Sequence, residues 1–341
     1  MKNHITKNRK IAILGTKGVP NNYGGFEQFA DFLSRKLVKR GYDVTVYNPH
    51  YYDVGTDYKG VNIIYCWCPE KTFGSGIGNI IFDFLCLLDS FKRNFDLIFE
   101  LGYQSVALSY IFLPIKRLKI VTNMDGIEWQ RSKWGKFQKI FIKKMEKIAV
   151  NKTDIIMSDN VGIENYIKKK YNKESVMIPY GANIHSKFDK KLLDHYNIKE
   201  KEYFLIIARM EPENNIEMMI EGFIKSESKN KLLIVGKKDT NYAKKLINKY
   251  SYKVKFIGGL YNLDHHLNSL RHYSNAYLHG HTVGGTNPSL VEAMSAQCLI
   301  ISHKNVFNLS VLGDDALYFS SVDELSNKIK NINHSNEIRS S

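Results

Sequence analysis

The chain has 341 residues, and at roughly 100 to 200 residues per domain this length predicts two domains. Hydrophobic residues make up 43% of the chain and charged residues 24%, which excludes a disordered protein and is typical of a folded one. The net charge of +15 favours an anionic partner, and it leaves phosphates, nucleic acid and anionic lipid open.

The N-terminus is polar and leads directly into an apolar segment, without the pattern of a secretory signal. The longest uncharged apolar run, residues 105–115, is about half of the roughly 20 residues that a membrane-spanning helix needs. We therefore expect a cytoplasmic protein with no transmembrane segment. The cysteines lack the spacing of a zinc site, so free thiols are expected at Cys66, Cys68, Cys86 and Cys298.

Short β-branched segments alternate with amphipathic helical segments along the chain, which is typical of parallel sheets built from βαβ units. A polar stretch without a strand, residues 184–202, separates two such series and predicts the domain boundary. The expected strands of the first series are residues 10–15, 43–48, 61–66, 97–102, 119–124, 154–159 and 175–179. Those of the second series are residues 203–209, 231–236, 254–258, 276–279, 298–302 and 316–319.

A glycine-rich loop follows the first expected strand and ends in Gly24 and Gly25, where an amphipathic helix begins. Such glycines let backbone amides approach an anion at the positive end of a helix, and a tight turn without a ligand is the alternative. The spacing is not G-x-G-x-x-G, and the second strand ends in Asn48 and Pro49 rather than in an acid. A dehydrogenase is therefore disfavoured.

A second glycine-containing loop leads into a helix that is expected to begin at Pro288. The amides of Ser289 and Leu290 are expected to be free to bind a diphosphate, and Glu292 to accept hydrogen bonds from the ribose beside it. The alternative for Glu292 is an acid that merely favours the first helical turn.

Arg209 ends the first expected strand of the second series. An arginine in this position can fork onto two phosphate oxygens, whereas an isolated surface arginine more often forms an ion pair. Because the helix that starts at Pro288 is expected on the opposite side of the same crevice, we favour phosphate binding for Arg209.

Taken together in chain order, these motifs resemble a retaining family 4 glycosyltransferase of GT-B architecture, in the bacterial rhamnosyltransferase-like subgroup. The segments that carry the resemblance are residues 15–30, 123–134, 208–223 and 279–294. The resemblance implies an α/β protein with two Rossmann-like parallel-sheet domains that face a cleft. Its parts are an acceptor-side domain at 1–183, a linker at 184–202 and a nucleotide-sugar-binding domain at 203–341.

The resemblance also implies roles for single residues. Arg209 is expected to bind the donor diphosphate and to act in catalysis. Asp125 stands where the broad family has a histidine, and it is expected to contact a sugar hydroxyl or stabilise an oxocarbenium ion, with helix capping as the alternative. The implied donor-binding residues are Gly24, Gly25, Arg209, Asn214, Gly258, Gly284, Gly285, Thr286, Asn287, Ser289, Leu290 and Glu292.

The sequence departs from the broad family in three places. Gly284 stands where that family has a second glutamate, and Asn214 or Asn215 stands where it usually has a lysine. Both changes argue against assuming a glucose donor. The family usually ends with a helix that crosses back onto the first domain, and here this crossover helix is expected to be missing or truncated after a helix at 322–332.

The implied function is transfer of a hexose, such as the 6-deoxyhexose rhamnose, from a nucleotide diphosphate donor to a lipid-linked saccharide in bacterial surface polysaccharide synthesis, with retention. No cofactor is expected besides the nucleotide sugar as co-substrate, and no metal, because no Asp-x-Asp pair follows a strand. No nucleic-acid partner is expected, because the sequence has no aromatic and basic reading module. The alternatives are a sugar-nucleotide epimerase of the same fold and a non-catalytic nucleotide-sugar binding protein.

The segment 131–152 is strongly basic, and Glu146 is its single acid. Its apolar residues recur at helical spacing, so they are expected to face either a core or a bilayer surface. A peripheral contact with an anionic membrane is one interpretation, and a solvated basic face of an ordinary helix is the other. The apolar residues are Phe137, Ile140, Phe141, Met145 and Ile148.

Overall fold

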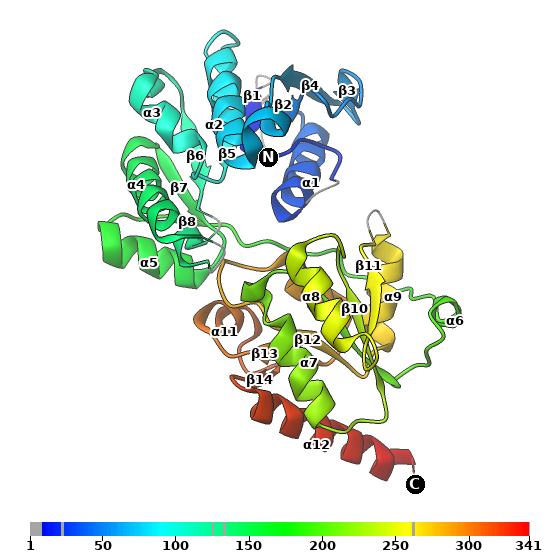
Figure 1. Cartoon of the computed structure of the whole chain (residues 1–341). Helices are drawn as coiled ribbons and strands as arrows, with labels where there is room; N and C mark the ends of the chain where they lie inside the picture. The colour runs from blue at the N-terminus through cyan, green and yellow to red at the C-terminus, as the bar shows by residue number, and fades with distance from the viewer. Residues whose placement is uncertain (1–8, 22–23, 125, 132–133, 261–262, 341) are drawn as a thin grey trace, which may run out of the picture. The chain divides into compact units, whose positions relative to one another are not determined.

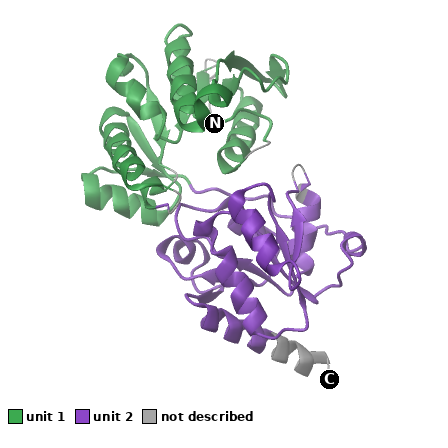
Figure 2. Ribbon diagram, viewed as in Figure 1, with its two compact units in different colours: residues 1–130, 134–178 green, residues 131–133, 179–341 purple. Residues whose placement is uncertain are grey.

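The computed structural model describes residues 9–340, apart from residues 22–23, 125, 132–133 and 261–262. The chain forms two compact units (Figure 2). Unit 1 comprises residues 1–130 and 134–178, and unit 2 comprises residues 131–133 and 179–341.

Unit 1 is built on an eight-stranded sheet with the order β3-β4-β2-β1-β5-β6-β7-β8 (Figure 1). Neighbouring strands are parallel, except for the antiparallel pair β3 and β4. The central strands β1, β2, β5 and β6 are buried on both faces, which explains their apolar, β-branched sequences. They are β1 (Lys10–Leu14), β2 (Asp43–Pro49), β3 (Asp57–Tyr58), β4 (Val61–Cys66), β5 (Leu97–Leu101), β6 (Ile120–Asn123), β7 (Ile155–Ser158) and β8 (Val176–Met177).

The helices of unit 1 cover both faces of this sheet. The chain moves in one direction from β1 to β2, and in the opposite direction from β4 through β8. Because crossovers between parallel strands are right-handed, α1 covers one face and α2 to α5 cover the other (Figure 1). The helices are α1 (Gly25–Lys39), α2 (Glu70–Ser90), α3 (Ser109–Phe112), α4 (Lys136–Lys152) and α5 (Val161–Tyr171), with the 3-10 turns η1 (Val106–Leu108), η2 (Ile115–Arg117) and η3 (Glu128–Gln130).

Helix α2 has the length and the apolar composition of a membrane-spanning helix, and it is the one helix of the described residues that does. The expectation from residues 105–115 did not consider this segment. One face of α2 is buried within unit 1, through Phe82, Cys86 and Leu87, and the helix is kinked at Gly74. Only 28% of its most apolar stretch is buried, so one face of α2 packs within unit 1 and the other is exposed.

Unit 2 is built on a six-stranded, fully parallel sheet with the order β11-β10-β9-β12-β13-β14. Its strands are β9 (Tyr203–Ile207), β10 (Lys231–Val235), β11 (Lys255–Gly258), β12 (Ala276–His279), β13 (Ile300–His303) and β14 (Leu317–Phe319). Its helices are α6 (Leu192–His195), α7 (Ile216–Lys225), α8 (Asn241–Tyr250), α9 (Asp264–Tyr273), α10 (Pro288–Ser295), α11 (Val306–Leu312) and α12 (Val322–Ser340), with the 3-10 turn η4 (Pro212–Asn214).

Two apolar cores enclose the sheet of unit 2. Alternate residues of β9 point to opposite faces, so that Phe204 and Ile206 join a core with α7, α8 and α12, whereas Tyr203 and Leu205 join a core with α6, α9 and α10. Residues 192–198, within the stretch expected as a linker, contribute to the second core. The expected α/β fold with two Rossmann-like parallel sheets is confirmed.

Candidate functional site

The candidate site of unit 2 lies at the carboxyl ends of β9 and β12, where the strand order reverses. From β9 the chain moves outward to β10 and β11, and it then returns to the other side of β9 as β12. In open parallel sheets, ligands bind in the crevice at such a switch point. The residues expected from the sequence at Arg209, at 284–287 and on α10 follow these two strands directly.

Helix α10 begins with an asparagine cap at Asn287. The Asn287 side chain accepts a hydrogen bond from the Ser289 amide at 2.9 Å, and the Asn287 carbonyl accepts from the Leu290 amide at 3.0 Å. The expectation of free amides at these two positions is therefore wrong for this structure. An asparagine at this position satisfies the donors that a diphosphate would otherwise bind.

Glu292 lies beyond the first turn of α10, so it is not merely a first-turn acid. Its Oε2 accepts a hydrogen bond from Arg271 Nη2 at 2.5 Å. The side chain of Arg271 is only 1% exposed, whereas that of Glu292 is 21% exposed. The carboxylate is thus held by a buried cation and remains partly exposed.

Arg271 has two further partners, which fix its guanidinium. Its Nη1 donates to Asn268 Oδ1 on the same helix, α9, and its Nη2 donates to Ser289 Oγ on α10, both at 3.0 Å. Ser289 Oγ in turn donates to the carbonyl of Ile207, the last residue of β9, at 3.4 Å. These bonds fasten α9 and α10 to the strand that leads to Arg209. The role of Arg271 is not predictable from the sequence, because nothing in the spacing of α9 and α10 shows that these helices touch.

The side chain of Arg209 is exposed at the end of β9. Among the residues that the structure describes, no carboxylate pairs with its guanidinium. The alternative role of Arg209, a surface ion pair, is therefore not supported by the described part of the chain. The backbone of Arg209 is fixed, since its carbonyl accepts from Asn214 Nδ2 at 2.7 Å.

Asn214 and His281 form one buried network that shapes the loop after β12. Asn214 Oδ1 and His281 Nδ1 are 2.7 Å apart, so the amide side chain of Asn214 is engaged at both ends. Burial, followed by the charges of His279, Arg131 and Arg209, lowers the pKa of His281 well below its usual value. The imidazole is therefore neutral and donates from Nδ1 to the amide oxygen. Asn214 positions the backbone of Arg209, and its direct contact with the donor stays a prediction.

Gly284 is required by the same network. Its φ of +145° is a conformation that L side chains rarely adopt, and a Cβ there would lie 2.7 Å from His281 Nε2. The His281 ring thus occupies the space into which the glutamate of the broad family would project. This contact gives a physical reason for the departure at position 284.

Neighbouring segments hold the rest of this loop. The side chains of Asn305 and Asn308, at the start of α11, donate to the His281 carbonyl at 2.9 and 3.0 Å. Gly285 and Thr286 are buried in the loop. His279, at the end of β12, is also buried, and burial lowers its pKa to about 3.

Gly258 is the expected donor-binding residue that unit 2 does not bring to this crevice. It ends β11, the edge strand, and β10 separates β11 from β9. At about 4.8 Å between neighbouring strands, Gly258 is roughly 10 Å from the end of β9 along the sheet. A contact with the nucleotide base, farther from the diphosphate, stays a prediction.

In unit 1, Gly24 caps α1 and Gly25 begins it. The carboxylate of Glu27 binds the loop that precedes this helix. Glu27, in the first turn of α1, accepts a hydrogen bond from the Lys17 amide at 2.8 Å and from Thr16 Oγ1 at 3.3 Å. This internal anion lies where a phosphate was expected, so phosphate binding by Gly24 and Gly25 stays a prediction. Asp125 lies outside the described residues.

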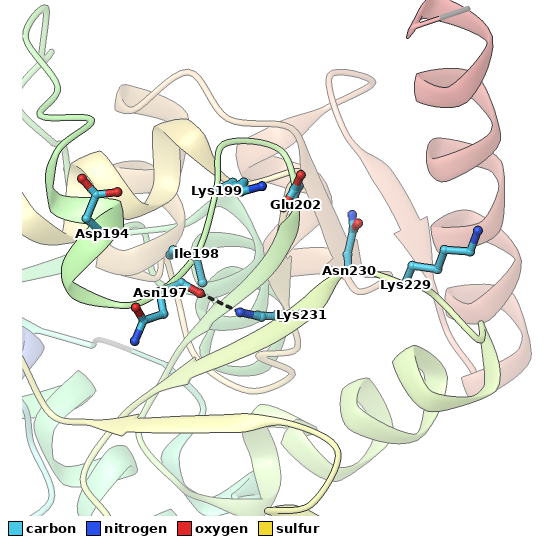
Figure 3. Close-up of a pocket in the computed structure, with 8 residues that line it drawn as sticks. All are labelled: Asp194, Asn197, Ile198, Lys199, Glu202, Lys229, Asn230 and Lys231. Carbon is cyan, nitrogen blue, oxygen red and sulfur yellow. Dashed lines mark hydrogen bonds between the residues drawn. The ribbon is translucent and has the colours of Figure 1, made fainter.

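A pocket of about 480 Å³ lies elsewhere in unit 2 (Figure 3). Its lining includes Lys231 at the start of β10, whose Nζ donates to the Asn197 carbonyl at 2.6 Å. The pocket is therefore at the amino ends of the strands, opposite the edge where parallel sheets bind ligands. We do not assign it to the donor.

The four cysteines are free. Within the described part of the chain, no group of three or more histidine, cysteine, aspartate or glutamate side chains is arranged to hold a metal ion. Metal independence itself stays a prediction.

Two families match the sequence. Residues 8–183, more than half of the chain, match the family described as domain of unknown function (DUF1972). The chain belongs to the DUF1972 family. Residues 188–341 match the glycosyl transferases group 1 family, and no curated protein matches the sequence significantly.

Solved structures with the same fold are glycosyltransferases of the GT-B type. They include sucrose-phosphate synthase from Thermosynechococcus elongatus, at 16% identity and a TM-score of 0.74 over 96% of this chain and 90% of that one. HepE of Anabaena, in complex with UDP and glucose, has 16% identity and a TM-score of 0.74 over 96% and 91%. WaaG, a glycosyltransferase involved in lipopolysaccharide biosynthesis, has 15% identity and a TM-score of 0.73 over 94% and 90%. Residues 188–341 thus match a glycosyltransferase family, and the chain as a whole shares the fold of these GT-B glycosyltransferases.

Proposed function

We propose that this DUF1972 protein transfers a hexosyl group from a nucleotide diphosphate sugar to a hydroxyl group of a lipid-linked saccharide, with retention of anomeric configuration. The observation that carries the proposal is the exposed Arg209, unpaired among the described residues, beside a helix whose Glu292 is fixed by a buried arginine. Retention, the 6-deoxyhexose rhamnose as the sugar, and the lipid-linked acceptor come from the resemblance of the sequence motifs.

The chemistry of the site fits a nucleotide diphosphate leaving group. In the transition state the sugar–phosphate bond breaks and negative charge grows on the diphosphate. A guanidinium on a rigid strand end stabilises that charge through two parallel hydrogen bonds. The carboxylate of Glu292, on the helix that follows β12, is suited to accept hydrogen bonds from the two ribose hydroxyls of the nucleotide.

The comparisons support a nucleotide-sugar donor. HepE was solved with UDP-glucose, and the trehalose-6-phosphate protein from E. coli with UDP-2-fluoro glucose. Since WaaG acts in lipopolysaccharide biosynthesis, a lipid-linked acceptor on the cytoplasmic face of a membrane is consistent with the same fold. We propose no metal requirement, and turnover that vanished with a chelator and returned with magnesium or manganese would contradict this.

Calorimetric titration with UDP-, GDP- and dTDP-sugars tests the donor site. One donor class is expected to bind, and Arg209→Ala is expected to weaken its affinity about 10- to 150-fold, the equivalent of losing about 1.5 to 3 kcal/mol of charged hydrogen bonding. Arg40→Ala, which removes an exposed arginine at the end of α1, is the matched control and should bind as the unmodified protein does. Equal donor affinity in both variants would exclude Arg209 from the site.

Product analysis without an acceptor separates the alternatives. A glycosyltransferase should leave most of the donor sugar unchanged until an acceptor saccharide is added. An epimerase would convert the donor alone, and a non-catalytic binding protein would leave it intact with and without acceptors.

A further inference from the structure

Large apolar side chains are exposed on one side of unit 1. They belong to α2, α3 and α4, and each is more than half exposed, with Phe137 at 90%. Exposed apolar residues scattered singly need no explanation, but a group on adjoining helices marks a surface that binds something apolar. The residues are Phe73, Ile77, Ile111, Phe112, Phe137 and Ile140.

The three helices form one layer, so their outer surfaces point the same way. They connect strands that succeed one another in the same direction across the sheet, which places them on the same face. Helix α2 packs against α3, and α3 packs against α4 (Figure 1). We call the outer surface of these helices, with the six residues above, the α2–α4 face.

Helix α4 shows that these outer apolar residues are not core residues. Its inner side buries Ile142, Met145 and Ala149 within unit 1. Phe137 and Phe141 lie on the opposite side of the helix and are exposed. The apolar residues of this helix were expected to face either a core or a bilayer surface. The inner ones pack in the core, and the outer ones are exposed and can contact a partner.

The exposed charges that α4 and η2 contribute to the α2–α4 face are positive. The single acid of α4, Glu146, is fully buried, and its Oε1 binds Lys170 Nζ at 2.8 Å and the hydroxyls of Tyr166 and Tyr171. The lysines of α4 have no acid beside them on the outer surface of that helix, and η2 adds two exposed cations next to α3. These cations are Lys136, Lys143, Lys144 and Lys147 on α4 with Lys116 and Arg117 on η2.

We propose that the α2–α4 face docks onto the surface of an anionic phospholipid bilayer, with its phenylalanines at the level of the head groups and its lysines on the lipid phosphates. A helix with aromatic residues among lysines binds such a surface through apolar burial and electrostatic attraction together. A second copy of the chain is a poorer partner, because a symmetric contact would place this cationic face against itself. The docking does not depend on the nature of the donor or the acceptor.

Flotation with lipid vesicles tests the proposal on the full chain. The protein is expected to float with vesicles of phosphatidylcholine and phosphatidylglycerol and not with phosphatidylcholine alone. High salt is expected to release it, since the screening length falls to about 3 Å at 1 M salt. No binding to the phosphatidylglycerol vesicles, or equal binding to both kinds, would overturn the proposal.

Two pairs of variants locate the surface. Phe137→Ser with Ile140→Ser should lower the partition into anionic vesicles at least tenfold, whereas Ile184→Ser with Tyr252→Ser, which removes residues of unit 2 that are 86% and 75% exposed, should not. Lys144→Gln with Lys147→Gln should lower it about 25-fold, at about fivefold for each lysine. Lys244→Gln with Lys245→Gln on α8 is the charge control.

A folding measurement and a sedimentation measurement complete the test. Because the substituted side chains are exposed, the circular dichroism and the Tm of every variant should match those of the unmodified protein. Binding of the Phe137 and Ile140 double variant at the unmodified level would overturn the proposal. A dimer in lipid-free solution that this variant abolishes would also overturn it, because the face would then bind a second copy.

Discussion

Arg271 Nη2 lies 2.5 Å from Glu292 Oε2, and this ion pair joins a fully buried side chain to one that reaches the surface. The arginine is fixed by Asn268 and Ser289 as well, so it determines where the carboxylate stands. Arg271 is a positioning residue for the ribose contact proposed for Glu292. Glu292 also matters for the stability of unit 2, because removing it would leave the buried guanidinium of Arg271 without a counter-charge.

The Glu292→Ala variant is therefore expected to be destabilised, and not merely inactive. It leaves the buried guanidinium without its carboxylate, and breaking a buried pair in this way costs on the order of 3 to 5 kcal/mol. Arg209→Ala should change the free energy of unfolding by less than about 0.5 kcal/mol, because the Arg209 side chain is exposed. Urea unfolding of both variants measures the difference, and equal stability would mean that the ion pair does not form.

Removing both partners separates stability from binding. Arg271→Met with Glu292→Leu replaces the buried pair by apolar groups of similar size, which is often neutral or stabilising. We expect this double variant to recover most of the stability lost in Glu292→Ala. Donor affinity, measured by calorimetry, should stay low in both. Recovery of donor binding in the double variant would show that Glu292 has only a structural role.

Gly284→Ala tests the contact that replaces the family glutamate. Alanine at a φ of +145° is strained, and its Cβ would collide with His281 Nε2 at 2.7 Å. We expect a loss of about 1 to 3 kcal/mol in the free energy of unfolding and a raised KM for the donor. Gly181→Ala is the control, since a Cβ there meets nothing within 4 Å and its φ is not positive. An unchanged Tm in Gly284→Ala would contradict the clash.

The sequence predicts the fold well, because each strand is a compact run of β-branched residues between turns. It misses β3, because two residues such as Asp57 and Tyr58 make no periodic pattern. It misses Arg271, the cap by Asn287 and the hydrogen bond from the Lys17 amide to Glu27. These depend on which segments touch or on a side chain that binds its own loop. Helical spacing found the apolar residues of α4, but it could not assign Met145 to the core and Phe137 to the surface, since both continue the same pattern.

His279 should make unit 2 sensitive to acid. Burial lowers its pKa from about 6.5 to about 3, so the folded state resists protonation while the unfolded state accepts the proton. Its contribution to stability is complete above pH 6.5 and is lost as the pH falls, at up to about 1.4 kcal/mol per pH unit. Since its Nε2 has no hydrogen-bond partner among the described residues, His279→Leu should keep the fold and flatten this dependence. Urea unfolding at pH 7 and pH 5 measures this dependence. An equal change in the free energy of unfolding between the two pH values in both proteins would refute the prediction.

Glu100 and Asp83 should give unit 1 the opposite dependence. Burial raises the pKa of Asp83 to about 6, and burial followed by the charge of Asp83 raises the pKa of Glu100 well above its usual value. The folded state therefore holds protons that the unfolded state releases, so stability is present at low pH and is lost as the pH rises from about 4 through the folded pKa values. Glu100→Gln removes one titrating group while keeping its shape. The free energy of unfolding of this variant, relative to that of the unmodified protein, should rise between pH 5 and pH 8. A difference independent of pH would mean that Glu100 is ionised in the folded chain. His279 changes the pH dependence of stability in the opposite direction. The contribution of each group is therefore obtained only by comparing its variant with the unmodified protein at each pH.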